Sequence, residues 1–290
     1  MDLLETLEKV TFKLLELAAT ALPKKVEAQL NRVIQEEKSE IGENQLAIIA
    51  KNIQSAKILK RPLCQDTGLI SFFIQSRNNF PNPSQVRNIL VKVTKKATQA
   101  IPLRPNAINF FEGNTGTNVG ELIPWIYWTD RSDSTFEITV QLKGGGSSNI
   151  SRLYMLNPTE GIKGIKKAII EAVASAGSRG CPPYTIGIGL GGTEDVAMLL
   201  AKKALLIPPD QRNSRKEFAE IELDLIQTLN TLGIGIMGLG YGPSVLDVHI
   251  MQAARHPASL PVGISFSCWA LRYATARITE DKIEYITHEG

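Results

Sequence analysis

The chain has 290 residues, of which 43% are hydrophobic, so it can bury a large core as one domain or as two interlocked subdomains. Its 32 lysines and arginines nearly balance its 29 aspartates and glutamates. The formal charge of +3 is too small to indicate a nucleic-acid-binding protein, although it is compatible with a small anionic substrate.

The start of the chain and its least charged stretches indicate where the protein is located. Met1-Asp2-Leu3-Leu4-Glu5 carries acidic side chains where a secretory signal peptide carries positive charge. Residues 187–192 and 233–242 are interrupted by glycines and are too irregular for a membrane span. We therefore expect a cytoplasmic protein that does not enter a membrane.

Hydrophobic periodicity predicts a mixed α/β fold. Apolar residues at steps of three and four predict helices in the N-terminal region, about residues 1–60. Beyond it, in an α/β part of about residues 61–290, strands are expected at 69–74, 136–142 and 184–188, and helices at 158–176, 193–206 and 215–230. Thr193 is predicted to cap the helix that follows it, and loops are expected at 81–84 and 208–210. No clean domain boundary is visible.

Three cysteines are the first candidates for chemistry. Cys64, Cys181 and Cys268 are an odd number in a chain expected in the cytoplasm, so a disulfide framework is not expected. Their spacing is far too wide for a zinc finger or a ferredoxin, and free cysteines are commonly small buried core residues. Each one nevertheless has glycine, proline or serine neighbours that are typical of loops, where backbone amides can approach a metal cluster.

Six short segments, in this order, together resemble the class I fumarase and L-tartrate dehydratase family. They are Cys64-Gln65-Asp66-Thr67-Gly68, Asn114-Thr115-Gly116-Thr117-Asn118, Lys143-Gly144-Gly145-Gly146-Ser147, Gly180-Cys181-Pro182-Pro183, Gly189-Leu190-Gly191-Gly192-Thr193 and Ala254-Arg255-His256-Pro257. The resemblance covers roughly residues 60–270. It implies that Cys64, Cys181 and Cys268 hold a 4Fe-4S cluster in which one iron lacks a protein ligand. Such an iron can act as a Lewis acid in a hydro-lyase, with the α/β part of the fold arranged around it.

The resemblance also suggests roles for two residues in proton transfer. Asp66 follows a cluster cysteine by two residues and is the candidate for proton transfer, although Asp-Thr-Gly is also ordinary turn chemistry. His256 resembles the family histidine that contacts this aspartate. His249 and His288 are its competitors, and a lone histidine is more often a structural residue.

Four further residues are implied to bind substrate. Arg104 matches a family arginine that binds a substrate carboxylate, and a planar guanidinium suits that contact; without the resemblance it would be a surface arginine. Gln65 is expected to donate an amide hydrogen bond, or else to make a local turn contact. Gly145 and Gly146 are expected to present backbone amides, with a flexible loop as the alternative.

The resemblance implies a partner as well. Single-chain members of the family continue into a second catalytic domain, whereas this sequence stops at Gly290. It therefore resembles the α-subunit of the two-subunit form, which needs a β-subunit and is expected to assemble as α2β2. The leading activity is interconversion of fumarate and L-malate, and dehydration of L-tartrate to oxaloacetate is the close alternative. Two other readings remain open: an iron–sulfur electron carrier, and a metal-free structural subunit with core cysteines.

Overall fold

The structure, a computed structural model, describes residues 3–77 and 81–288, which form two compact units. The first unit contains Met1–Lys24, Ala50–Gly145 and Arg272–Gly290, and the second contains Lys25–Ile49 and Gly146–Leu271. The chain thus passes between the units four times. The helices of the N-terminal region, about residues 1–60, are shared between the two units.

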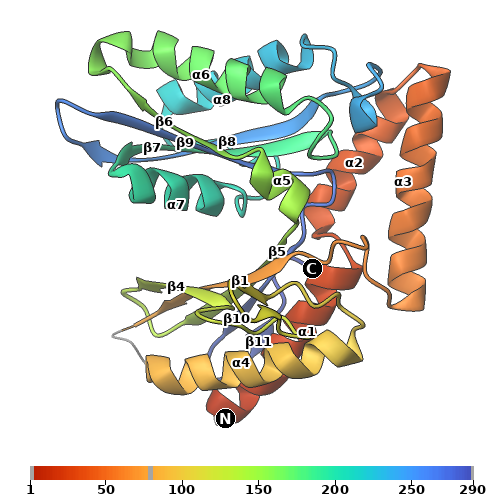
Figure 1. The fold of residues 1–290 in the computed structure, drawn as a ribbon, viewed down its shortest axis with the longest axis vertical. Coiled ribbons are helices and arrows are strands. Elements are labelled where there is room, and N and C mark those ends of the chain that lie inside the picture. Colours follow the sequence, from red (N-terminus) through yellow and green to blue (C-terminus); the bar gives the residue numbers. More distant parts are fainter. Residues whose placement is uncertain (1–2, 78–80, 289–290) are drawn as a thin grey trace. The chain divides into compact units, whose positions relative to one another are not determined.

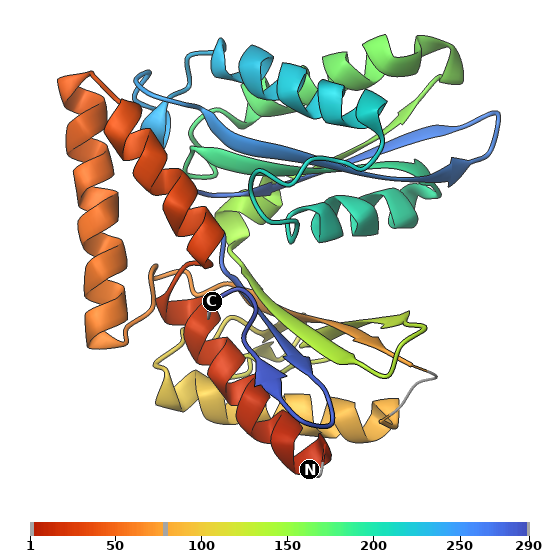
Figure 2. The same ribbon diagram turned by 180° about the vertical axis from the view of Figure 1, so that it is seen from behind.

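The first unit is a five-stranded sheet with two helices on one face (Figure 1). Its strand order is β11-β10-β5-β1-β4, in which only β1 and β4 are parallel neighbours. Seen from behind, α1 runs alongside β10 (Figure 2). The elements of this unit are α1 (Leu3–Thr20), β1 (Leu69–Ser76), α4 (Pro83–Ala100), β2 (Ile108–Asn109), β3 (Gly113–Asn114), β4 (Trp125–Asp130), β5 (Phe136–Lys143), β10 (Tyr273–Ile278) and β11 (Ile283–Glu284).

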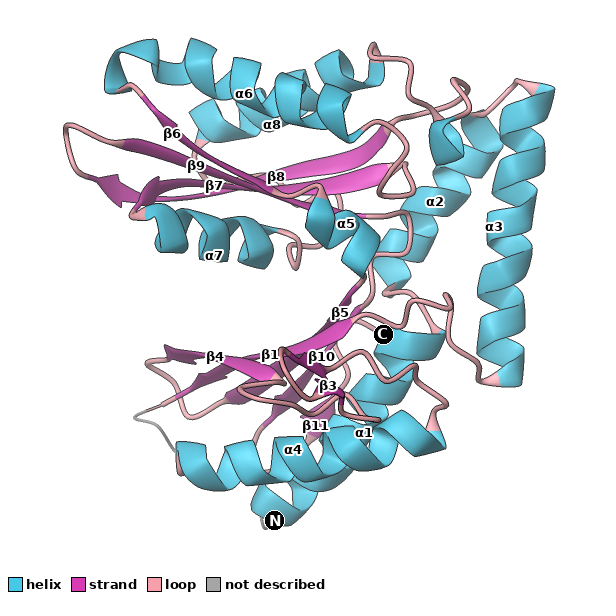
Figure 3. Ribbon diagram, in the orientation of Figure 1, coloured by secondary structure: helices cyan, strands magenta, loops and turns pink. Residues whose placement is uncertain are grey.

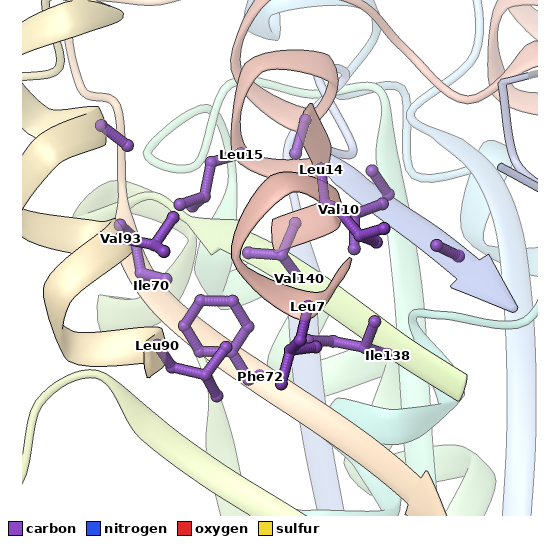
Figure 4. Packing of buried hydrophobic residues seen from close by; sticks show 14 of the residues in the cluster. Leu7, Val10, Leu14, Leu15, Ile70, Phe72, Leu90, Val93, Ile138 and Val140 are labelled. Carbon is purple, nitrogen blue, oxygen red and sulfur yellow. The ribbon is translucent and has the colours of Figure 1, made fainter. Parts of the chain in front are cut away.

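The core of the first unit lies between this sheet and the helices α1 and α4. Every second residue of β1 and β5 faces the helices, and the helices supply apolar residues at steps of three and four (Figure 4). Burying one such side chain contributes roughly 1.5–3 kcal/mol. The residues labelled in Figure 4 are Leu7, Val10, Leu14, Leu15, Ile70, Phe72, Leu90, Val93, Ile138 and Val140.

The second unit is a four-stranded sheet with helices on both faces. Its strand order is β6-β9-β7-β8; β7 and β8 are parallel, and the other neighbours are antiparallel. Helices α6 and α8 cover one face and α7 covers the other (Figure 3). The elements are α2 (Lys24–Glu36), α5 (Gly145–Asn149), β6 (Arg152–Leu156), α6 (Gly161–Ala176), β7 (Tyr184–Gly192), α7 (Glu194–Ala204), α8 (Lys216–Asn230), β8 (Val245–Arg255) and β9 (Leu260–Ser267), with 3-10 turns at Pro158–Glu160 and Ile236–Gly238. Helix α3 (Glu40–Leu59) begins in this unit and ends in the first.

The glycines of β7 allow α7 to pack directly on the sheet. A Cβ atom at Gly189 would overlap the carbonyl oxygen of Ala197, and one at Gly187 would overlap that of Ala201. Gly263 of β9 faces Ala197 in the same way. Gly187 and Gly189 of this glycine-rich run therefore provide the surface on which α7 packs.

Most of the predicted elements are confirmed. The three predicted strands are β1, β5 and β7, and the three predicted helices correspond to the Pro158–Glu160 turn with α6, to α7 and to α8. The loop predicted at 81–84 was partly wrong, because Pro83 and Ser84 already belong to α4. Within residues 3–77 and 81–288, no helix combines the length and apolar composition that crossing a membrane requires.

The capping role predicted for Thr193 was wrong in its mechanism. Thr193 does immediately precede α7, but its hydroxyl donates to the Asp195 carboxylate at 2.5 Å and caps no backbone amide. That hydrogen bond and the Val196 amide hold the pKa of Asp195 below its usual range. The acidic side chain, and not the hydroxyl, interacts with the positive end of the helix.

Candidate active site

The loop that carries Cys64 connects α3 to β1 in the first unit. Its start is fixed by Leu63, which is buried, donates its amide to the Ala19 carbonyl at 2.9 Å and accepts the Asn52 side chain at 2.8 Å. Cys64 itself is half-buried and forms no disulfide. The loop therefore presents a thiol from a backbone anchored to α1 and α3.

The carboxylate of Asp66 is held by two backbone amides. Its Oδ1 accepts the Gly68 amide at 3.0 Å, and its Oδ2 accepts the Gly145 amide at 2.7 Å. The turn needs glycine at 68, where φ is +85° and a Cβ atom would meet the backbone of Leu142 at 2.8 Å. Asp66 thus has the local turn contact expected of Asp-Thr-Gly and also a contact with the end of β5.

Arg104, Cys64 and Gln65 border one cavity in the first unit. It has a volume of about 320 Å³, and its lining residues are Arg61, Pro62, Cys64, Gln65, Thr67, Pro102 and Arg104. Arg104 and Gln65 are exposed, so their polar ends can meet a ligand from solvent. Two guanidinium groups around one opening favour a carboxylate or another anion.

Two side chains to which the sequence analysis gave no role, those of Thr67 and Asn118, hold the backbone of Arg104. The Thr67 hydroxyl accepts the Arg104 amide at 3.0 Å, and the Asn118 side chain donates to the Arg104 carbonyl at 3.1 Å. Asn106 adds a bond from its side chain to the Gly68 carbonyl at 3.1 Å. Asn118 belongs to one of the family-like segments, whereas Arg61 and Asn106 carried no signal beyond their proximity to Cys64 and Arg104.

Cys181 and Cys268 lie at the same end of the sheet in the second unit. Cys181 precedes β7 and Cys268 follows β9, and these neighbouring strands pair through Thr185 and Ser267. The Trp269 amide donates to the Cys181 carbonyl at 3.2 Å, which joins the two loops. Cys181 has a φ of +58°, a conformation that costs energy for any residue with a side chain.

Tyr184 makes two hydrogen bonds to the backbone of the loop before Cys181. Its hydroxyl donates to the Gly177 carbonyl at 2.6 Å and accepts the Gly180 amide at 3.1 Å. Burial raises the pKa of Tyr184, and the nearby thiols of Cys181 and Cys268 raise it further. The Tyr184 hydroxyl thus fixes the backbone at Gly177 and Gly180, directly before Cys181.

His256 lies at the opposite end of this sheet from the two cysteines. It is exposed in the turn between β8 and β9, where its Nδ1 accepts the Ala258 amide at 3.1 Å. The strand β9 begins after this turn and ends next to Cys268, a length of roughly 25 Å for an eight-residue strand. Of its competitors, His249 and His288 have their pKa lowered to about 4 by burial, so His256 is the exposed histidine of the three.

The structure thus brings together some of the predicted residues and not others. Cys64, Gln65 and Arg104 share a cavity, Asp66 contacts Gly145, and Cys181 lies beside the Cys268 loop. Gly146 belongs to the second unit, where a Cβ atom would lie 3.4 Å from the Arg179 carbonyl oxygen. Across the parts of the chain that are described, no group of three His, Cys, Asp or Glu side chains is close enough to hold a metal ion. Convergence of the three cysteines, which are divided between the two units, therefore stays a prediction.

Comparison with known proteins identifies the family. The sequence pattern of the fumarate hydratase (Fumerase) family matches residues 8–277. A protein of Methanocaldococcus jannaschii, provisionally named L(+)-tartrate dehydratase subunit alpha, is 44% identical over 278 residues, which cover 94% of this chain and 97% of the relative. The L(+)-tartrate dehydratase subunits alpha of Escherichia coli K12 and Shigella sonnei are each 38% identical over 275 residues, covering 93% of this chain and 90% of each relative. The chain therefore belongs to the fumarate hydratase family and is a hydro-lyase.

Proposed function

We propose that this chain is the α-subunit of an iron–sulfur hydro-lyase that reversibly adds water to fumarate to give L-malate. The observation that carries the proposal is the cavity where Arg61 and Arg104 lie with Cys64 and Gln65. A small dicarboxylate suits the two guanidinium groups, and the neighbouring thiol suits an iron ligand.

Dehydration of L-tartrate to oxaloacetate is the second candidate. The relatives reported above are named L(+)-tartrate dehydratase subunits, and this observation favours tartrate. L-malate and L-tartrate differ by one hydroxyl group, and both carry the two carboxylates that the arginines would bind. The substrate choice is therefore a matter for direct measurement.

The cysteines suit an iron–sulfur cluster better than a role in the core. Cys64 and Cys268 are half-buried, Cys181 is exposed, and all three lie in loops and form no disulfide. Core cysteines would be buried, which argues against a metal-free subunit with structural cysteines. Bound through three thiolates, a 4Fe-4S cluster would supply one iron as a Lewis acid for the substrate hydroxyl.

The chain's own groups would bind the substrate and move its protons. Arg104, assisted by Arg61, would bind a substrate carboxylate, and Gln65 would orient the substrate through its amide. Asp66 would transfer the proton of the substrate hydroxyl, since two amides hold its carboxylate in one position. The Gly145 amide would act through Asp66, to which it donates, and not directly on the substrate.

A β-subunit would complete this site. The relatives' name "subunit alpha" supports the existence of a partner chain. We propose that the β-subunit covers the substrate, excludes water from the reacting carbons and adds the group that takes the proton from carbon. We propose an α2β2 assembly. A location in the cytoplasm agrees with three cysteines that form no disulfide, because thiols stay reduced in that compartment.

The test is anaerobic reconstitution with iron and sulfide, followed by assays with fumarate, L-malate and L-tartrate. We expect bound iron and sulfide in the α-subunit, and turnover only when the β-subunit is added. Metal content without lyase turnover in the mixture would favour the electron-carrier alternative. Full turnover by the α-subunit alone would contradict the two-subunit site, and the better substrate would decide between the two hydro-lyase activities.

A further inference from the structure

Arg272 is a buried arginine that the proposed mechanism has not used. It is the first residue of the last segment of the first unit, directly before β10, and only 3% of its surface is exposed. Its Nη1 donates to the carbonyl oxygen of Asp66 at 2.7 Å, across 206 residues of sequence. Its own carbonyl accepts the Leu142 amide at 3.0 Å, which ties the residue to the end of β5.

The guanidinium lies beside the glycines that follow β5. A Cβ atom at Gly144 would be 3.3 Å from Nη2 of Arg272 and 3.0 Å from Oδ2 of Asp66. Gly144 therefore lets the backbone approach both groups at once. The next residue, Gly145, donates its amide to Asp66 Oδ2.

Within the described ranges, 3–77 and 81–288, Arg272 forms no ion pair with a carboxylate at a distance of 4.0 Å or less. Its Nε is also buried without a hydrogen-bond partner. By contrast, Arg277 on the same strand β10 pairs with Glu137 at 3.1 Å. A buried charge of this kind is costly, so its presence beside Asp66 calls for a specific function.

We infer that Arg272 is a positioning residue of the active site, an inference that rests on the proposed function. Its guanidinium fixes the main chain of Asp66 and thereby keeps the Asp66 carboxylate between the amides of Gly68 and Gly145. The Asp66 carbonyl is two residues from Cys64, so the same contact also steadies the loop that borders the cationic cavity. Arg272 acts through Asp66 and does not bind the substrate.

The first test uses hydrogen–deuterium exchange of the metal-free α-subunit. In Arg272→Met, the amides of Gly68 and Gly145 should exchange faster, because the displaced carboxylate no longer accepts them. The matched control is Arg277→Met, which removes an arginine from the same strand and should leave exchange at both amides unchanged. Wild-type exchange at Gly68 and Gly145 in Arg272→Met would overturn the inference.

The second test uses the assembled, cluster-loaded enzyme. Arg272→Met should lower kcat roughly ten- to hundred-fold through misplacement of Asp66, while KM changes less than about threefold. Arg272→Lys keeps a positive donor and should recover part of kcat. Unchanged kcat in Arg272→Met, or a loss confined to KM, would overturn the positioning role.

These outcomes separate the inference from the proposed function. Absence of lyase turnover in the wild-type complex would contradict the function, whereas exchange in the metal-free protein would still report on Asp66. If Arg272→Met unfolds, Arg272→Lys decides the question. Faster exchange at Gly68 and Gly145 with lower kcat in Arg272→Lys supports the inference, and wild-type values of both overturn it.

Discussion

Asp66 and Gly145 are joined by a 2.7 Å hydrogen bond from the glycine amide to Oδ2 of the carboxylate, although 79 residues separate them in sequence. An aspartate that only stabilises a turn needs one hydrogen bond within its own loop, and the Gly68 amide provides it. The second bond links the loop after Cys64 to the end of β5. Asp66 is therefore held more firmly than a turn alone requires, as a group that transfers protons should be.

Asp66→Asn should preserve cluster content and lower kcat by roughly a hundred- to ten-thousand-fold, because an amide cannot act as the acid or base. Measured iron, sulfide and kcat of the assembled enzyme check this expectation. The control is Asp133→Asn, which changes an aspartate that pairs with Arg131 and accepts the Thr135 amide in a turn. Near-normal kcat in Asp66→Asn would reduce Asp66 to a structural residue.

Arg104→Lys should raise KM roughly tenfold and change kcat less, because an ammonium group cannot form the two parallel bonds of a guanidinium. Steady-state kinetics with each dicarboxylate provide the measurement. Arg152→Lys is a suitable control, since Arg152 lies on β6 and donates to the carbonyls of Asn149 and Ser151. An unchanged KM in Arg104→Lys would remove Arg104 from the substrate site.

Gly189→Ala should destabilise the second unit by about 3 kcal/mol, because the added methyl group overlaps the Ala197 carbonyl of α7. Gly113→Ala is the comparison, since Gly113 has open space around its Cβ position and a φ of +82°. There the cost is the conformational one, about 1 kcal/mol. Urea unfolding of both variants measures the difference, and equal losses would contradict direct packing of α7 on β7.

Local sequence signals were sufficient where apolar and polar residues alternate clearly, as they do along β5. Phe136 to Leu142 alternates apolar and polar residues, and the strand β5 is found there. The strand β8 was missed because its sheet is covered on both faces and its buried positions do not alternate, whereas β9 was not predicted although its apolar residues do alternate. Asp247 and His249 of β8 are both buried, which further obscures the pattern.

The site was predictable only where its residues match those of the family that the sequence resembles. Cys64, Gln65 and Arg104 were anticipated, and they share a cavity. Arg272 was not, because its contact with Asp66 depends on β10, a strand that the sequence did not reveal. The turn that contains His256 was not predicted either, because the strands β8 and β9 that it joins were missed. The distance between His256 and Cys268 was therefore unforeseen.

Stability should fall in mild acid because of His249. Burial lowers its pKa to about 4 from an ordinary value of 6.5, so the folded state favours the neutral ring and the unfolded state binds the proton first. The stabilisation is complete above pH 6.5 and is lost as the pH falls towards 4, by up to about 3 kcal/mol. Urea unfolding at several pH values between 7 and 4 measures the free energy of unfolding. This free energy should fall less steeply with decreasing pH in His249→Gln than in wild type. His256→Gln, which changes an exposed histidine, serves as the control, and equal slopes in wild type and His249→Gln would contradict the assignment.

The cluster proposed at Cys268 would lie too far from His256 of the same copy, so we predict that His256 acts on the active site of a neighbouring α-subunit. Within one copy the β8–β9 turn lies roughly 25 Å from Cys268, because the whole of β9 separates them. Pairing of two α-subunits, as proposed, offers a route by which this exposed turn reaches a second copy.

A mixture of two inactive variants tests this arrangement. Asp66→Asn and His256→Asn should each inactivate α2β2 when present in both α-subunits. In a mixed pair, the copy with intact Asp66 receives the intact His256 of its neighbour, so one of the two sites works. Equal mixing makes half of the pairs mixed, and anaerobic assays should therefore recover about a quarter of wild-type activity by the reciprocity of a two-fold interface. If His256 served its own copy, both sites of every mixed pair would be defective, and no activity would return.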